Sequence, residues 1–335
     1  MGVIDAIAEG CFAVARRPFV LLPLVLLDLV YWLGVRVSLD PLMAWPIAML
    51  EWAQRQNTAA DPTGQVGPNA ADVASMAADL HTVGQQTDLL EILSIGQNPL
   101  LPKLTSASVG RPWGVGVLDL GSGWFTLVAM FGLLVVGLLW FALTLAVVAT
   151  VVRDDPPTPV ELARRVLRCW GRLIVLGLLL VAVSIFLGVP LLVLAGLLQF
   201  LGLNPGGPAL LLLIPVLLAL IFLSRTTDAM AVSDVGPLRS IKLSVTVVRH
   251  NFWMMFRLFA AGTLISFGFP IAWAFVARQT AGVPLAVVGN AFLNTGLLAA
   301  AMILYRERLA ALEKPAATAG QQRQAPPSAD PRDRR

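Results

Sequence analysis

One acidic residue, Asp28, interrupts the first long apolar stretch of the chain, Pro18 to Val37. At a rise of about 1.5 Å per residue, it lies about 15 Å along a helix that begins at Pro18. Because an ionised carboxylate is costly inside a bilayer, an ionisable residue in a span is a functional hypothesis by default. The alternatives are a transport site and a structural role, in which the carboxyl group is protonated or pairs with a cation. We expect the structural role, since one carboxylate makes a poor proton relay.

Arg257 is the cation that we expect to pair with Asp28. It comes eight residues after Arg249, and Asp28 comes twelve residues after Arg16. If Arg16 and Arg249 lie at one membrane surface, Asp28 and Arg257 differ in depth by about 6 Å, which an arginine side chain can span. The sequence therefore predicts a polar pair between the first and fifth spans.

Two amides, Asn290 and Asn294, lie four residues apart on the last apolar stretch, close to Gly289 and Gly296. Residues four apart share a helix face. Amides and small residues on one face usually indicate close packing between membrane helices. A polar lining for a substrate path is the alternative.

The sequence has no arrangement of residues typical of an enzyme. P-loop, CxxC and HExxH motifs do not occur, and no second intramembrane aspartate could complete an aspartyl protease. The two histidines, His81 and His250, lie too far apart in the sequence to suggest a metal site. We therefore predict a protein that is not an enzyme and binds no metal and no cofactor. Cys11 and Cys169 are expected to be free thiols, because both fall in segments predicted to be cytoplasmic.

The composition is that of a membrane protein. Of the 335 residues, 57% are hydrophobic and 13% are charged, whereas a soluble domain carries about 25% charged residues. This is too little charge to cover a soluble globule. The net charge of +4 is explained by an excess of cytoplasmic Lys and Arg, and we predict no binding of nucleic acid.

Six apolar stretches could cross a membrane, since a span needs about 20 apolar residues. They are Pro18 to Val37, Trp124 to Val152, Leu173 to Leu203, Ala209 to Leu223, Phe252 to Ala277 and Pro284 to Tyr305. Pro190 lies within the third, which we interpret as a kinked or tilted helix rather than a broken one. The first stretch is longer than a signal-peptide core and is expected to stay in the mature protein.

The positive charges fall mostly on one side of the predicted membrane. Of the 24 Lys and Arg residues, 19 lie in the segments 1–17, 153–172, 224–257 and 306–335. An excess of Lys and Arg marks the cytoplasmic side of a membrane. We therefore predict a multi-pass protein of a bacterial cytoplasmic membrane with both termini in the cytoplasm.

Three basic amphipathic segments, 9–23, 160–176 and 238–259, each lead into an apolar stretch. Apolar residues one helical turn apart, followed by an arginine and an aromatic residue, are typical of a helix that lies among lipid headgroups. The three segments can be aligned, and either duplication or the shared physics of entering a bilayer explains the match. The arginines expected to face anionic headgroups are Arg16, Arg17, Arg164, Arg165, Arg168 and Arg249.

The stretch 225–253 has a small and acidic turn, then an amphipathic helix with a central serine, then an arginine, a polar residue and aromatics. These are Asp234, Gly236, Ser244, Arg249, Asn251, Phe252 and Trp253. In this it resembles bacterial multi-helix membrane proteins related to the membrane domain attached to some glycerophosphodiester phosphodiesterases. The resemblance implies a multi-helix membrane fold and no catalytic activity, because that membrane domain is not the part that hydrolyses phosphodiesters.

Residues 38–121 form a large segment that we predict on the outer side. Helices are expected over 41–57 and 70–95, and an irregular stretch over 96–121. We interpret this segment as a cap over the outer ends of the bundle, with a docking surface or lid as the alternative. The predicted domains are 1–37 (interfacial helix and first span), 38–121 (extracytoplasmic cap), 122–310 (spans two to six) and 311–335 (disordered cytoplasmic tail).

Taken together, these features predict an all-α integral membrane protein with six transmembrane helices, three amphipathic interfacial helices on the cytoplasmic side and a small helical outer cap. The predicted function is non-enzymatic association with membrane lipids, through their anionic headgroups, or with a membrane protein partner. A small-molecule or lipid transporter with a cavity near Asp28 is the alternative. A lipid-modifying enzyme is a third, weaker possibility.

Overall fold

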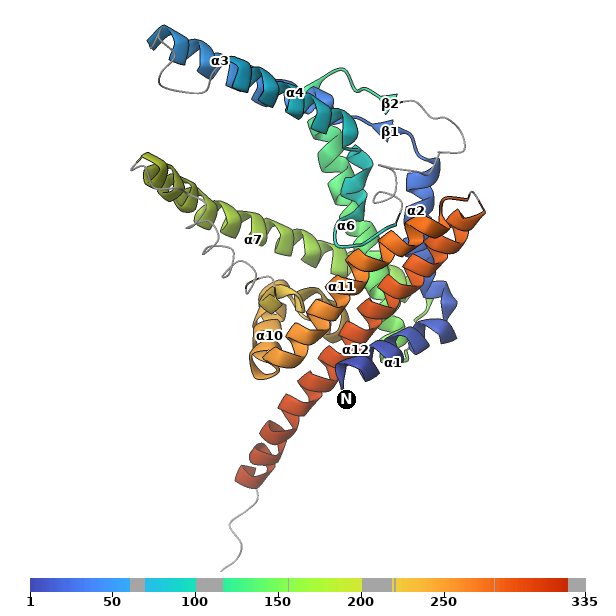
Figure 1. The fold of residues 1–335 in the computed structure, drawn as a ribbon. Coiled ribbons are helices and arrows are strands. Elements are labelled where there is room, and N and C mark those ends of the chain that lie inside the picture. Colours follow the sequence, from blue (N-terminus) through green and yellow to red (C-terminus); the bar gives the residue numbers. More distant parts are fainter. Residues whose placement is uncertain are drawn as a thin grey trace, which may run out of the picture. The chain divides into compact units, whose positions relative to one another are not determined.

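The computed structural model is almost entirely helical (Figure 1). It describes residues 1–60, 70–100, 117–155, 157–200, 219, 221–279 and 281–324. The elements, in order, are α1 (Val3–Arg16), η1 (Pro18–Leu21), α2 (Leu22–Leu33), β1 (Arg36–Val37), α3 (Asp40–Ala60), α4 (Ala70–Gln86), η2 (Leu89–Ser94), β2 (Val117–Leu118), α6 (Gly123–Arg153), α7 (Pro159–Phe200), α9 (Thr226–Ser233), α10 (Pro237–His250), α11 (Phe252–Val276) and α12 (Gly282–Gln324). The all-α prediction is confirmed.

Four helices in the described part of the chain are long and apolar enough to cross a membrane. They are Gly123–Arg153, Pro159–Pro190, Phe252–Val276 and Gly282–Leu312. The broken pair Val3–Arg16 and Pro18–Leu33 adds a fifth if the pair counts as one span. The predicted fourth span, Ala209 to Leu223, lies mostly outside the described residues.

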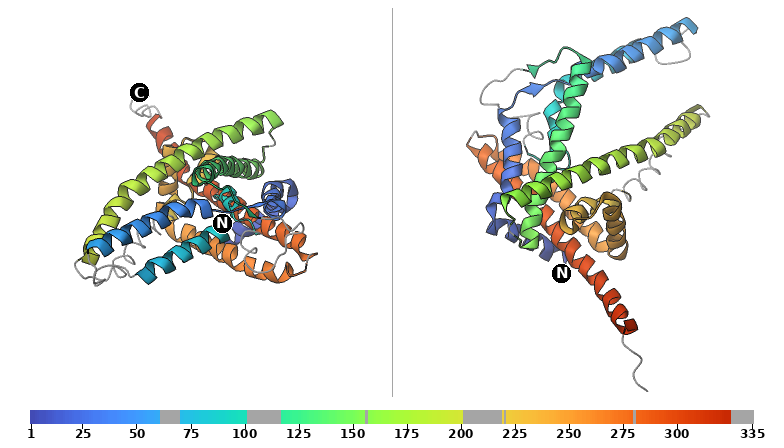
Figure 2. Two further views of the ribbon diagram at one scale, coloured as in Figure 1. Left: turned by 90° about the horizontal axis from the view of Figure 1, so that it is seen from above. Right: turned by 180° about the vertical axis from the view of Figure 1, so that it is seen from behind.

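The predicted interfacial segment 160–176 and the span that follows it form one continuous helix, α7 (Figure 2). Pro190 lies inside this helix, in agreement with the prediction that the helix is not broken there. By contrast, α10 and α11 are separate helices. Asn251 separates them, because its backbone carbonyl accepts from the amides of Met254 and Met255 and so begins a new helix.

The tail does not begin where we predicted it. Helix α12 continues from Gly282 to Gln324, through the first part of the segment 311–335 that we expected to be disordered. This part contains Ala, Leu, Glu, Lys and Gln, which have high helix propensity, but also Pro315, which lacks a backbone N–H, so helix propensity alone does not account for the extension. Residues 325–335 lie outside the described part.

The insertion 38–121, predicted to lie on the outer side, contains a helical pair, α3 and α4, which lie side by side (Figure 1). Helix α4 ends at Gln86, and not at residue 95 as predicted. Asp88 accounts for the difference: its carboxylate accepts from the amide of Leu90 and starts the 3₁₀ helix η2, and it also accepts from the amide of Val37 in β1. Strand β1 pairs in parallel with β2, so that the start and the end of the insertion lie side by side.

The chain divides into two compact units. Unit 1 comprises Met1–Pro18, Leu145–Ile265 and Thr295–Arg335, and unit 2 comprises Phe19–Thr144 and Ser266–Asn294. The core of unit 1 includes Ala6, Ile221, Ala229, Val247, Val248, Met255, Leu258, Ala301, Leu304 and Tyr305. The core of unit 2 includes Leu24, Leu27, Tyr31, Leu93, Leu100, Ala277, Val283, Ala286, Val287 and Ala291.

Within unit 1, helix α1 packs closely against α12 (Figure 1). The buried residues of α1 are Ala6, Gly10 and Val14, which are spaced four apart on one face. A β-carbon at Gly10 would lie 2.4 Å from the carbonyl oxygen of Gly296. Glycine is therefore required here, because the two backbones approach each other directly.

Candidate functional site

In unit 2, the polar residues of two predicted spans bind one short stretch of non-helical backbone, residues 96–100. The side chain of Asp28 in α2 is fully buried, and its Oδ1 accepts a hydrogen bond from the amide of Leu100 at 2.8 Å. The neighbouring Tyr31 donates its hydroxyl to the carbonyl of Leu90 at 2.7 Å. Asp28 thus anchors the segment that follows η2.

Asn290 and Asn294 bind the same segment from α12. Asn290 is 2% exposed, and its Nδ2 donates to the carbonyl of Asn98 at 3.0 Å. Asn294 donates to the same carbonyl and to Oδ1 of Asn290, and it accepts from the hydroxyl of Ser266 in α11. The two amides that we predicted on one helix face therefore act together, and their partner is loop backbone.

Helix α6 supplies a third side of this arrangement. The hydroxyl of Thr144 donates a hydrogen bond to Oε1 of Gln97 at 3.4 Å. Gly96 has a φ of +73°, a conformation that glycine adopts readily. A β-carbon there would also lie 2.6 Å from the ring of Phe141. We call Asp28, Thr144, Asn290 and Asn294 the polar clamp, because together they hold residues 96–100.

The polar clamp explains how non-helical backbone can lie beside residues of predicted spans. Backbone N–H and C=O groups cannot remain unpaired in a lipid environment, and irregular backbone is tolerated where protein groups satisfy it. The Asp28 carboxylate and the two amides perform this task for Leu100 and Asn98. Arg257 belongs to unit 1 and Asp28 to unit 2, so their predicted contact stays a prediction.

The six arginines predicted to face lipid fall into two groups in unit 1. Three are ion-paired: Arg17 with Asp154, Arg165 with both Asp155 and Glu161, and Arg168 with Asp234. Arg172, on the same helix as Arg168, also binds Asp234. Ion pairs at this level of exposure contribute at most about 1 kcal/mol each to stability.

The other three predicted arginines are exposed. Arg16 lies over the ring of Phe12, with its guanidinium carbon 4.3 Å from the ring centroid. Arg164 in α7 and Arg249 in α10 are exposed. Among the residues that the structure describes, none of these three arginines forms an ion pair. Their charges are therefore available to an external anion.

The residues that carried the family resemblance have structural roles in unit 1. Asp234 ends α9 with a φ of +52° and binds the two arginines of α7. Ser244, fully buried in α10, donates its hydroxyl to the carbonyl of Phe222 at 2.6 Å. Asn251 separates α10 from α11. These contacts explain the residue types at Asp234, Ser244 and Asn251 without catalysis.

The sequence reasoning missed a buried ion pair. Arg225, just before α9, donates to Asp228 at 3.0 Å, and both side chains are buried. Burial raises the pKa of the Asp228 carboxyl, and the charge of Arg225 opposes this effect. The spacing of three residues between an arginine and an aspartate was the available signal.

No group of three or more His, Cys, Asp and Glu that could hold a metal ion occurs in the described ranges. Cys11 and Cys169 are both free thiols, and Cys169 is buried. Comparisons with protein-family models, with curated proteins and with solved structures found no match.

Proposed function

We propose that this chain is a non-enzymatic polytopic membrane protein that associates with lipid, or with a protein partner, through its arginine-rich side. The observation that carries the proposal is a set of exposed arginines on three helices, α1, α7 and α10, that form no ion pair with any residue that the structure describes. Each helix either leads into a candidate span or continues as one. Arginines at such positions meet phosphate groups at a membrane surface.

Aromatic residues beside these arginines support the proposal. Phe12 in α1 is 57% exposed, and Trp253 at the start of α11 is 69% exposed. Exposed aromatic rings next to basic residues are typical of the headgroup region, where the ring enters the lipid and the charge stays at the surface. We place both in the cytoplasmic headgroup layer.

The proposed topology is that of six spans in a bacterial cytoplasmic membrane, with three amphipathic helices on the cytoplasmic side. The charge split supports it, because 19 of the 24 Lys and Arg residues fall in segments that six spans bring to one side. The proposed family relationship, to membrane domains of the phosphodiesterase-associated type, rests on the stretch 225–253 alone.

The test is the preference of the full chain for anionic lipid. The protein is reconstituted in vesicles of brominated phosphatidylglycerol or brominated phosphatidylcholine, and quenching of its tryptophans reports which lipid is bound. We expect wild-type protein to prefer phosphatidylglycerol and Arg164→Gln/Arg249→Gln to lose part of this preference. Added salt should reduce the preference as well, since exposed charges are screened beyond about 10 Å at 0.1 M salt.

The matched control is Arg36→Gln/Arg55→Gln, which removes the same charge from the side predicted to be extracytoplasmic. This variant should keep the wild-type preference. Equal quenching by both lipids in the wild type would contradict association through anionic headgroups. A loss of preference of the same size in the control would show that only net charge matters.

A transporter is the second candidate, and the polar clamp is the observation that favours it. Non-helical backbone held by polar side chains between helices also occurs at transporter substrate sites. A structural role remains the stronger proposal, because Asp28 is fully buried and bound to Leu100. Intact, folded Asp28→Asn protein that had lost uptake of a substrate would favour the transporter.

A further inference from the structure

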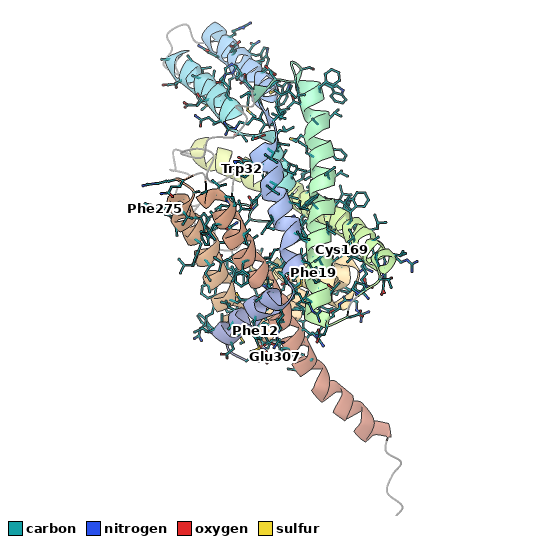
Figure 3. All side chains as sticks on the ribbon, turned by 90° about the vertical axis from the view of Figure 1, so that its right-hand side faces the viewer. Phe12, Phe19, Trp32, Cys169, Phe275 and Glu307 are labelled. Atoms are coloured by element: carbon teal, nitrogen blue, oxygen red, sulfur yellow. The ribbon has the colours of Figure 1, made fainter. Side chains whose placement is uncertain are left out.

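Unit 1 contains a cavity of about 560 Å³ where α1, the end of α6 and α12 meet. Figure 3 labels two of its lining residues, Phe12 of α1 and Glu307 of α12. Four arginines line it, contributed by all three helices: Arg16, Arg17, Arg153 and Arg306. The cavity therefore gathers positive charge from parts of the sequence that are far apart.

Three of the four arginines have no carboxylate partner in the described residues. Arg17 pairs with Asp154. Arg306 donates to the carbonyl of Val152 and Arg153 to that of Ala231, which are neutral acceptors. Arg16 lies over the ring of Phe12. These contacts leave the positive charges of Arg16, Arg153 and Arg306 uncompensated.

The carboxylates of the cavity do not balance this charge. Asp154 is already bound to Arg17, and Glu307 pairs with the amino group of Met1. Glu9 is the remaining acid in the lining.

The rest of the lining is apolar. It includes Phe12, Val151, Val152 and Ile303. An arginine cluster suits the oxygens of a phosphate group, which it can bind bidentately, and the apolar wall suits hydrocarbon. From this combination we infer that the cavity is a specific binding site for the headgroup of one anionic phospholipid, with the start of its acyl chains along the apolar wall.

Size and composition favour a lipid over free phosphate. Cavities that hold organic ligands measure about 300–1,000 Å³, and this one, at about 560 Å³, falls in that range. An inorganic ion would leave the apolar wall without a partner. This inference rests on the proposed function, because it assigns the lipid association to one defined place in addition to the exposed helix surfaces.

The experiment measures the lipid that stays bound to the full chain after purification in detergent. Native mass spectrometry counts bound molecules of dioleoyl phosphatidylglycerol, with dioleoyl phosphatidylcholine as the competitor. We expect one tightly held phosphatidylglycerol in the wild type. Arg16→Gln/Arg306→Gln should weaken its binding by about tenfold or more for each arginine, the usual effect of losing a charge-assisted hydrogen bond.

Two further variants separate the site from general charge effects. Ala13→Phe fills part of the cavity without a change in charge and should also expel the lipid. Arg164→Gln/Arg249→Gln removes two charges outside the cavity and should keep the tightly held lipid. Inorganic phosphate should not displace it, whereas soluble dihexanoyl phosphatidylglycerol should.

Retention of the same lipid by both cavity variants would overturn the inference. If the exposed-arginine variant nevertheless lost its lipid preference in vesicles, the proposed function would stand without the site. No retained lipid in the wild type and no preference in vesicles would overturn both. Displacement of the lipid by inorganic phosphate alone would overturn the assignment of the site to a lipid.

Discussion

At the scale of single residues, the most informative side chain is Asp28, because its partner is a backbone amide. A carboxylate that accepts from a buried N–H supplies an acceptor where water is absent. The amide of Leu100 donates this bond to Asp28, whereas the carbonyl of Asn98 accepts one from the side-chain amide of Asn290. Polar residues in the predicted spans thus stabilise a loop inside unit 2, which a search for charge partners alone would not reveal.

We predict that Asp28→Ala destabilises the protein and that Asp28→Asn has a much smaller effect. Alanine leaves the Leu100 amide without an acceptor, at a cost of about 1–3 kcal/mol, whereas asparagine keeps an oxygen at Oδ1. Thermal unfolding of the detergent-solubilised protein, followed by tryptophan fluorescence, measures the difference. The control is Asp79→Ala, at an exposed residue of α4.

The two Asp28 variants also test the predicted pair with Arg257. If Asp28→Asn is as destabilising as Asp28→Ala, then the negative charge matters more than the acceptor. That result would favour an arginine partner over the role of the Leu100 hydrogen bond.

The sequence was sufficient to select Asp28, Asn290 and Asn294 as residues of interest, since polar groups in apolar stretches are conspicuous. It could not identify their common partner. The bonds go to the backbone of Asn98 and Leu100, and backbone groups are the same at every position. Likewise, the pairing of Arg168 and Arg172 with Asp234 joins residues more than 60 positions apart, which no local pattern predicts.

At the scale of elements, the contact between α1 and α12 depends on the absence of a side chain. Gly10 and Gly296 allow the two backbones to touch, and Cys11 covers Gly296. The apolar and basic pattern predicted an amphipathic segment over 9–23, whereas in the structure α1 covers Val3–Arg16 and a 3₁₀ helix follows it. The face that α1 buries is set by its contact with α12 at Gly296, about 290 residues further along the chain. Local periodicity within α1 gives no information about that contact.

Gly10→Leu is therefore expected to detach α1 from α12. Even the β-carbon of a leucine would lie 2.4 Å from the carbonyl oxygen of Gly296, and overpacking costs typically about 1–3 kcal/mol or more. The matched control is Gly177→Leu, also a helical glycine, whose β-carbon would meet nothing within 4 Å. Reactivity of Cys11 toward a small maleimide provides the measurement, and it should rise in Gly10→Leu alone. Unchanged reactivity would mean that the two helices do not need this contact.

At the scale of the whole molecule, charge and hydropathy predicted the helical membrane class, because lipid imposes those properties on every span. They were less informative about where helices end. In α7, for example, no proline or consecutive glycines separate the basic interfacial segment from the apolar span. The two therefore form one continuous helix. Helix α12 likewise continues beyond its apolar part to Gln324, since charge ends a membrane span but does not end a helix.

The topology makes a prediction for the intact protein in cells. Single cysteines at Ser75 in α4 and at Thr246 in α10, in a background without Cys11 and Cys169, should lie on opposite sides of the membrane. A membrane-impermeant maleimide should label the first in intact cells and the second after the membrane is opened. Labelling of both sites in intact cells would contradict the proposed positive-inside arrangement.

Unit 2 is built from two segments far apart in the sequence, Phe19–Thr144 and Ser266–Asn294, and this sets the order in which it can assemble during synthesis. Residues 96–100 are made early, but two of the side chains that hold them, Asn290 and Asn294, are made nearly 200 residues later. Until the last helix emerges from the ribosome, the carbonyl of Asn98 lacks these partners. The early half of the chain therefore cannot complete its final packing before α12 has been made.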